Sequence, residues 1–322
     1  MIYNIMININ DAYAQHCCVM LCSLFENNRH LKFHIHIFSF DLSKNAQELL
    51  NSFTEKYGNK ICFYILSSLD IEFPNVENHH VSKEAYLRLF APRYLDDSLD
   101  KILYLDVDLL VLKNIEELYS IDLKDKLIAA IEDYPIADRC KRLRIPADYG
   151  YFNSGVMLIN LTLWRKYKIT EQAYSILVRN DIILLQHDQD ILNLIAYDKW
   201  LRLPFKWNVL DIFFFDYTPY DKKYYKEIAH SLKEDTGIMH FAGPLKPWIA
   251  WFPNPFYRHY YKYLSKTPWK GYTPSIKVQW RAYPFPRNLM TILKIDRVLV
   301  PLKKRITEYL KKSYVLKKER GI

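Results

Sequence analysis

The segment KILYLDVDLLVL carries two aspartates separated by one residue, a spacing that suggests metal chemistry. Asp106 and Asp108 follow the apolar run 102–105 and precede the apolar run 109–112. Neighbouring residues of a strand point to opposite faces, but both carboxylates can converge where a strand ends and the chain turns. Two hard oxygen donors suit Mg²⁺ or Mn²⁺, with diphosphate oxygens completing the coordination shell. The alternative interpretation of such a pair is a capped turn.

The elements that must position this pair alternate between strands and helices along the chain. That alternation predicts an α/β fold, a parallel sheet with helices on its faces. Ligands of such sheets bind beyond the carboxyl ends of the strands, which is where the two aspartates lie. Ser43 is the expected N-cap of the second helix. The patterns predict strands over 2–9, 33–40, 61–66, 101–104, 127–131 and 156–159, and helices over 14–27, 43–57, 85–94 and 190–196.

Three further motifs follow LYLDVD along the chain: YFNSGVMLINLTLW at 151–164, HDQDILN at 187–193 and HFAGPLKPW at 240–248. In this order the four motifs resemble glycosyltransferase family eight, the glycogenin and lipopolysaccharide galactosyl- and glucosyltransferase family. The likeness covers residues 2–248 and is greatest to bacterial lipooligosaccharide α-galactosyltransferases. It implies a GT-A type, Rossmann-like nucleotide-sugar-binding fold with a mixed, mainly parallel sheet. It also implies a bound Mn²⁺ or Mg²⁺ and a UDP-sugar donor.

The resemblance assigns the metal to Asp106, Asp108 and His240, and a neutral imidazole suits Mn²⁺. Gly243 and Lys246 resemble the segment that closes over the diphosphate. Glycine permits close backbone approach there, and lysine supplies a point charge. Without the resemblance, the histidine would be interpreted as a packed or surface residue and the lysine as a surface residue.

The stretch NINDAY at 8–13 resembles the loop that holds uridine, with Tyr13 stacking on the base. The family commonly has Asp where this chain has Asn10, and Asn where it has Ala12. An asparagine still accepts from uracil N3–H through its side-chain oxygen. Asp11 is interpreted either as a further polar contact or as a turn residue.

The resemblance also implies that the remaining candidate residues lie near the sugar of the donor. Arg88, in YLRLF, matches an arginine near the diphosphate and sugar, although alone it would be interpreted as a surface helix residue. Asp133, in AAIEDY, matches an acceptor- or sugar-side carboxylate. Asn153 and Asp188 match residues that hydrogen-bond the sugar, and Gln189 lies at its reacting face. Asp188, Gln189 and Asp133 are thus the expected catalytic residues, with a helix N-cap as the alternative role of Asp188.

The implied function is a retaining hexosyltransferase in lipopolysaccharide or cell-surface polysaccharide assembly. It would move galactose or glucose from a UDP-sugar to a glycan or lipid-linked glycan acceptor. Two-step retention requires a carboxylate nucleophile, and Gln189 is a poor nucleophile. We therefore favour same-face internal return, with Asp188 positioning the sugar. The metal and Lys246 would neutralise the departing UDP.

Two other functions are weighed against sugar transfer. Asn10 and Ala12 would suit a non-catalytic carbohydrate- or membrane-binding protein with a degenerate donor site, although the metal residues and Lys246 argue against it. A phosphatase of the haloacid dehalogenase type also places two such aspartates after a strand. That class has Thr or Val closely following the second aspartate, whereas two leucines follow Asp108 in this chain.

The excess positive charge lies in the C-terminal part of the chain. The 322 residues carry a net charge of +9, and residues 275–322 hold 13 Lys/Arg against 3 Asp/Glu. The strand and helix pattern breaks after about Pro253, and from Leu302 apolar residues fall on one helical face. A basic amphipathic helix after an aromatic-rich stretch suits an anionic membrane surface, with a solvated terminal helix as the alternative. No nucleic-acid-binding module accompanies it. We expect a glycosyltransferase domain over 1–265 and a basic, aromatic membrane-associating segment over 266–322.

Cysteine usage and the N-terminus predict the compartment. The five cysteines form no CxxC pair with a distant partner, so we expect buried, reduced thiols. The N-terminal stretch 1–8 is too short and polar for a signal peptide. No run approaches the roughly 20 apolar residues that span a bilayer. The expected location is the cytoplasm, in peripheral association with the inner face of the membrane.

Overall fold

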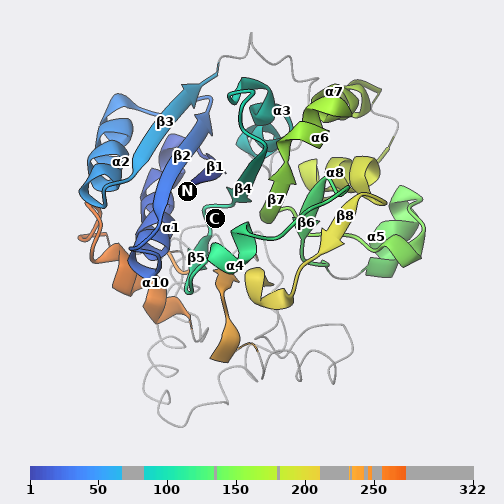
Figure 1. Ribbon diagram of the computed structural model, residues 1–322. Coiled ribbons are helices and arrows are strands. Elements are labelled where there is room, and N and C mark those ends of the chain that lie inside the picture. The colour runs from blue at the N-terminus through green and yellow to red at the C-terminus, as the bar shows by residue number, and fades with distance from the viewer. Residues whose placement is uncertain are drawn as a thin grey trace, which may run out of the picture.

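The computed structural model describes residues 1–66, 83–133, 136–179, 182–210, 232, 234–242, 246–248 and 256–272. Its central sheet (Figure 1) contains, in spatial order, β3 (Lys60–Ile65), β2 (Lys32–Ser39), β1 (Ile2–Asn8), β4 (Lys101–Leu105), β7 (Val156–Asn160), β6 (Ile128–Ala130) and β8 (Trp200–Arg202). Every neighbouring pair is parallel except that β7 runs antiparallel to both β4 and β6. The predicted mixed, mainly parallel sheet is confirmed.

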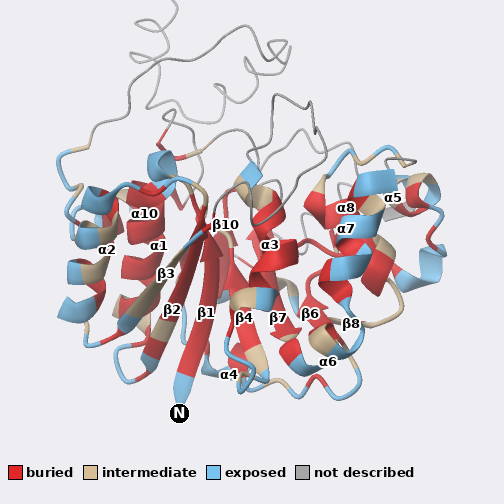
Figure 2. Cartoon of the chain, turned by 90° about the horizontal axis from the view of Figure 1, so that it is seen from above, coloured by how far each residue is buried: buried red, intermediate tan, exposed pale blue. Residues whose placement is uncertain are grey.

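Helices cover both faces of this sheet (Figure 2). One face packs against α1 (Ala14–Asn27), α2 (Lys44–Lys56) and α10 (Tyr257–Leu264), and the other against α3 (Leu87–Phe90), α6 (Leu161–Lys166), α7 (Ile169–Arg179) and α8 (Asp188–Ala196). The strand β1 shows the cause, because Ile5 and Ile7 belong to the first core cluster and Met6 to the second. A strand buried on both faces requires apolar residues at consecutive positions, as the sequence of β1 has.

A second, three-stranded sheet holds the turn that contains the two aspartates. In it β10 (Ile238–His240) lies between β5 (Leu109–Val111), to which it is antiparallel, and β9 (Val209–Leu210), to which it is parallel. The register pairs His240 with Leu109, and Phe241 N donates to Asp108 O at 2.8 Å. The end of β10 is thereby fixed beside the turn between β4 and β5.

The reversed direction of β7 brings another segment to the same edge. Leu105 pairs with Val156, and Asp106 N donates to Gly155 O at 2.8 Å. Because β7 runs antiparallel to β4, the residues before β7 lie where β4 ends. The carboxyl end of β4, the start of β7 and the end of β10 therefore meet.

The short strands β5, β8, β9 and β10 and the helices α6 and α7 have no counterpart among the predicted elements. Two other stretches also differ from the sequence-based expectation. The helix predicted over 85–94 is divided into a 3₁₀ turn (Lys83–Tyr86), α3 and a second 3₁₀ turn (Ala91–Tyr94). Pro92 has no N–H to continue α-helical hydrogen bonding beyond α3. After the break in the pattern, α10 packs on α1 through aromatic side chains three residues apart. The other predicted elements are confirmed to within two residues, and Ser43 caps α2 by accepting from Ala46 N at 3.2 Å.

The cysteine prediction largely holds. All five cysteines are unpaired, four are buried, and Cys62 is half-buried with its Sγ 3.2 Å from His34 Nε2. In the described part of the chain, no helix has both the length and the apolar character to cross a membrane. Trp269 and Tyr272 pack against the core. Residues 273–322, most of the expected membrane-associating segment, lie outside the described residues, so the domain boundary at 265 stays a prediction.

Candidate active site

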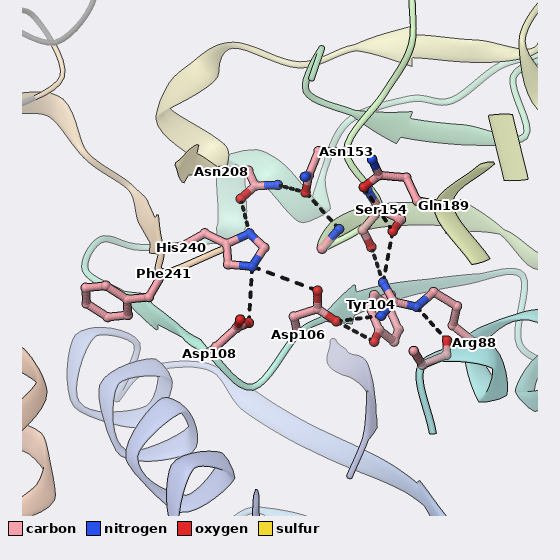
Figure 3. Close-up of polar contacts among 12 residues, drawn as sticks. Arg88, Tyr104, Asp106, Asp108, Asn153, Ser154, Gln189, Asn208, His240 and Phe241 are labelled. Atoms are coloured by element: carbon pink, nitrogen blue, oxygen red, sulfur yellow. Dashed lines mark hydrogen bonds and ion pairs between the residues drawn. The ribbon is translucent and has the colours of Figure 1, made fainter. Parts of the chain in front are cut away.

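Three side chains that could hold a metal ion converge at the edge where β4 ends (Figure 3). His240 Nε2 lies 3.1 Å from Asp108 Oδ1 and 3.9 Å from Asp106 Oδ2. One ligand atom from each residue lies within 4.8 Å of the others. The carboxylates come from the turn between β4 and β5, and the imidazole comes from the end of β10. The two aspartates therefore converge as expected for residues at the end of a strand.

A chain of hydrogen bonds fixes which nitrogen of His240 faces these carboxylates (Figure 3). Gly155 N donates to Asn153 Oδ1 at 2.9 Å, so this oxygen is the acceptor for Asn208 Nδ2 at 2.8 Å. Asn208 Oδ1 then faces His240 and accepts from Nδ1 at 2.9 Å. With Nδ1 protonated, Nε2 is left to bind a metal ion or a second proton. Two carboxylates and an imidazole oriented in this way fit Mn²⁺ as a donor set.

Gly155 is required for the close packing of these ligands. A Cβ atom at this position would lie 2.3 Å from His240 Cε1 and 2.9 Å from Asp106 Oδ2. Contacts of a real Cβ atom under 3.0 Å are essentially never seen, so another residue would displace the imidazole. Neither Gly155 nor Asn208 was selected from the sequence, although the NSG stretch before β7 offered a signal for the glycine.

Charges around the metal ligands stabilise one another. Lys246 Nζ donates to Asp108 Oδ2 at 2.6 Å and also to the carbonyl of Phe241. Burial opposes ionisation of Asp108, but Lys246 and His240 outweigh it and hold the pKa of Asp108 well below its usual range. Burial likewise opposes protonation of His240, but Asp108 and Asp106 outweigh it and raise the pKa of His240. A cation between the carboxylates and the imidazole is therefore favoured.

Aromatic stacking holds the segment that carries Lys246. The ring of Trp248 stacks on His16 of α1 with centroids 3.7 Å apart. Burial lowers the pKa of His16 to about 3, so the stacked imidazole is neutral. This packing keeps Lys246 at the metal ligands, where the diphosphate was expected. Its predicted neighbour Gly243 lies outside the described residues.

Arg88 is a buried cation and not a surface helix residue. Its guanidinium donates to Asp106 Oδ1 at 2.9 Å and to the carbonyl and hydroxyl oxygens of Ser154 at 2.9 and 3.1 Å. The Tyr104 hydroxyl donates to the same oxygen of Asp106 at 2.6 Å. The other oxygen of Asp106 is thereby directed toward the imidazole (Figure 3).

Asp188 begins α8 and is almost fully buried. Its Oδ2 lies 2.9 Å from Arg88 Nε, an ion pair without hydrogen-bond geometry, because that N–H donates to a backbone carbonyl. Burial raises the pKa of Asp188 to about 6, although Arg88 opposes the shift. His187, the N-cap of α8, has φ 51° and ψ −117°, a strained conformation for a residue other than glycine. The alternative role of Asp188 as the N-cap is therefore wrong.

The amide of Gln189 is hydrogen-bonded through both its oxygen and its nitrogen. Its Oε1 accepts from Ser154 N at 3.0 Å, and its Nε2 donates to Asp133 Oδ2 at 2.8 Å and to the Tyr151 hydroxyl at 3.2 Å. Asp133 Oδ2 also accepts from Asn153 Nδ2 at 3.3 Å. The residues expected on the sugar side thus form one network that joins the metal ligands through Asn153 and Ser154.

The expected uridine loop follows β1. The buried Oδ1 of Asn10 has no hydrogen-bond partner among the described residues. Asp11 accepts from Ser43 N at 2.9 Å, a contact that joins this loop to the start of α2. The ring of Tyr13 is 36% exposed and lies edge-on to Trp248, with centroids 6.3 Å apart. Asn10 and Tyr13 are therefore the better candidates for contact with a nucleotide.

Known proteins resemble this chain over most of its length. A family model described as Glycosyl transferase family 8 matches residues 4–252. General stress protein A of Bacillus subtilis (strain 168) is 32% identical over 268 residues, which cover 81% of this chain and 92% of that protein. A lipopolysaccharide 1,2-glucosyltransferase of Escherichia coli is 29% identical over 309 residues, 94% of this chain and 90% of that protein.

Among solved structures, galactosyltransferase LgtC in complex with donor and acceptor sugar analogues has a TM-score of 0.72 and 23% identity. The match covers 86% of this chain and 99% of that chain, and it confirms the GT-A type fold. The family model spans most of the chain. The chain therefore belongs to glycosyl transferase family 8.

Proposed function

We propose that this chain is a retaining, metal-dependent hexosyltransferase that moves galactose or glucose from a UDP-sugar to a glycan or lipid-linked glycan acceptor. The observation that carries the proposal is the convergence of Asp106, Asp108 and His240, with Nε2 of the histidine directed at the carboxylates. The similarity to a lipopolysaccharide 1,2-glucosyltransferase supports a hexose donor and a role in lipopolysaccharide or cell-surface polysaccharide assembly.

Asp106, Asp108 and His240 would hold Mn²⁺ or Mg²⁺. When bound, the metal would supply positive charge to the diphosphate leaving group. Lys246 beside Asp108 and Arg88 beside Asp106 would add positive charge to either side. Because these side chains are largely buried, their charges act with little screening by solvent.

The nucleotide would bind beside β1. The unpartnered oxygen of Asn10 can accept from uracil N3–H, and the ring of Tyr13 can stack on the base. Asp11 would contribute by holding the loop to α2. Gly243 would allow the backbone to approach the diphosphate.

Asp188, Gln189, Asp133 and Asn153 would surround the donor sugar. With a pKa of about 6, Asp188 is mostly ionised at neutral pH and can orient the sugar and stabilise its developing positive charge. Gln189 is a neutral amide engaged in hydrogen bonds, which supports same-face internal return over a two-step reaction through a covalent intermediate.

The membrane role rests on charge. The 13 Lys/Arg of residues 275–322 support association of the segment 266–322 with an anionic membrane surface, and we place the glycosyltransferase domain at 1–265. The proposed location is the cytoplasmic face of the membrane, where a lipid-linked acceptor would be reached.

Hydrolysis of a panel of UDP-sugars with Mn²⁺, with Mg²⁺ and with a chelator tests the proposal. We expect slow, metal-dependent hydrolysis of UDP-galactose or UDP-glucose, its loss in Asp108→Asn, and no change in Asp97→Asn, whose side chain is 97% exposed. Release of phosphate from aryl phosphates would indicate a phosphatase instead. Binding of UDP-sugars without turnover would indicate a degenerate donor site.

A further inference from the structure

A buried polar cluster contacts the nitrogen side of the Gln189 amide, and apart from Asp133 its residues have no part in the proposed reaction. It consists of Asp133, Tyr151 and Asp190 together with two arginines of α5 (Ile136–Leu143). Tyr151 and Asp190 are 0% exposed, and Asp133 is 5% exposed. Buried charged groups are costly unless each is paired and hydrogen-bonded, so the arrangement of this cluster needs a reason.

Donors and acceptors can be assigned to the hydrogen bonds of the cluster in only one consistent way. The Tyr151 hydroxyl donates to Asp190 Oδ1 at 2.7 Å, and it can therefore only accept from Gln189 Nε2 at 3.2 Å. Asp133 Oδ2 accepts from the same nitrogen at 2.8 Å. Both protons of the amide nitrogen are thereby used, and the amide oxygen must point the other way, toward Ser154 N.

The two arginines of α5 form ion pairs with the two carboxylates of this cluster. Arg139 forms an ion pair with Asp133 and lies over the ring of Tyr151, 5.1 Å from its centroid. Arg142 donates through both terminal nitrogens to the two oxygens of Asp190, each at 2.9 Å. Burial and then Asp190 raise the pKa of Tyr151, so its hydroxyl keeps the proton that it donates.

We propose that Tyr151, Arg139 and Arg142 are positioning residues that fix the Gln189 amide with its oxygen toward Ser154 and its nitrogen toward α5. The inference rests on the proposed function, in which Gln189 lies at the reacting face of the donor sugar. A terminal amide rotates readily between two nearly equivalent orientations, and only its partners select one. Loss of the cluster would leave the hydrogen bond from Ser154 N as the main contact that holds the amide in this orientation, while the metal and diphosphate contacts stay intact.

The variant Tyr151→Phe keeps the packed ring and removes the hydroxyl. We expect kcat for UDP-sugar hydrolysis to fall about three- to tenfold, the effect of losing one buried hydrogen bond. The KM for the donor and the affinity for Mn²⁺ should stay within about twofold of wild type, because their contacts lie elsewhere. The control Tyr149→Phe alters a 43% exposed tyrosine whose ring contacts Tyr197, and it should change neither parameter.

A double variant separates positioning from a general structural role. If Tyr151 acts through the amide, Tyr151→Phe should have no further effect on kcat in a Gln189→Ala background. Additive losses would overturn the inference. At Arg139, the variant Arg139→Lys should retain more of the wild-type kcat than Arg139→Met. Equal losses of kcat in both variants would contradict a role for the charge.

Different results would refute the positioning role and the proposed function. If Gln189→Ala lowers kcat but Tyr151→Phe turns over like wild type, the positioning role is refuted and the proposed function stands. If the wild-type protein hydrolyses no UDP-sugar with Mn²⁺, the proposed function fails and the positioning role fails with it.

Discussion

Replacing Gly155 with alanine should weaken metal binding more than it weakens the fold. The new Cβ would lie 2.3 Å from His240 Cε1, and ordinary contacts begin at 3.4 Å, so the imidazole must move by about 1.1 Å. Metal–nitrogen distances tolerate only about 0.2 Å, and the same movement would strain the hydrogen bond to Asn208. Loss of such support typically lowers metal affinity about 10- to 100-fold, or about 1.4 to 2.8 kcal/mol.

Mn²⁺ affinity is measured by calorimetric titration, and thermal unfolding in metal-free buffer is measured in parallel. The control Gly271→Ala adds a Cβ that meets no atom within 4 Å, and it should keep wild-type affinity and stability. A folded Gly155→Ala protein that binds Mn²⁺ as tightly as wild type would refute the reasoning. It would mean that the backbone relaxes enough to restore the position of the imidazole.

Three further substitutions should alter the pH dependence of stability, the turnover and the affinity for UDP, respectively. Burial raises the pKa of Asp188 to about 6 from its usual 3.8, so the stability it contributes is present below pH 4 and is lost as pH rises through 6. In urea unfolding without metal, the free energy of unfolding of Asp188→Asn should therefore rise by about 2–3 kcal/mol relative to that of wild type between pH 4 and pH 7. A difference between the two proteins that does not change with pH would contradict this. Lys246→Met should keep Mn²⁺ binding but lower kcat for UDP-sugar hydrolysis by about 10²- to 10³-fold, and near-normal kcat would remove Lys246 from leaving-group stabilisation. Tyr13→Ala should weaken UDP binding about tenfold in calorimetry, and unchanged affinity would exclude its ring from the base site.

The strands β1 to β4, β6 and β7 and the aspartate pair could be predicted because they depend on local patterns, whereas the short strands β5, β8, β9 and β10 were not predicted. The apolar run before Asp106 is a strand for reasons contained within five residues, and the turn after it follows from the second apolar run. The helix α2 likewise follows from its own periodicity and from Ser43 at its start. For α10 the signal was present, because Tyr257, Tyr260 and Tyr263 repeat every three residues. The surrounding prolines and aromatic residues obscured it.

The orientation of the metal ligands could not be predicted in this way, because it depends on contacts between distant segments. Asn208 lies 32 residues from His240, and it acts on the imidazole only because β9 and β10 pair in one register. Gly155 matters because β7 is antiparallel to β4, a reversal that no local pattern announces. His240 itself was found through resemblance, since a histidine at the end of an apolar stretch is usually a packed residue.

The charges of the described site give a physical reason for metal and donor to bind together. Apart from the ion pair of Asp133 and Arg139, the site holds three carboxylates, two permanent cations and one imidazole, which are Asp106, Asp108 and Asp188, Arg88 and Lys246, and His240. Protonation of the imidazole can at most balance the excess negative charge. The diphosphate of a UDP-sugar would then meet no net attraction in a setting where charges are weakly screened. A divalent cation that displaces the proton reverses the balance to a net positive site. On the proposed function, a chelator should therefore raise the Kd for UDP itself as well as stop turnover, and calorimetry showing equal UDP affinity with and without Mn²⁺ would contradict this account.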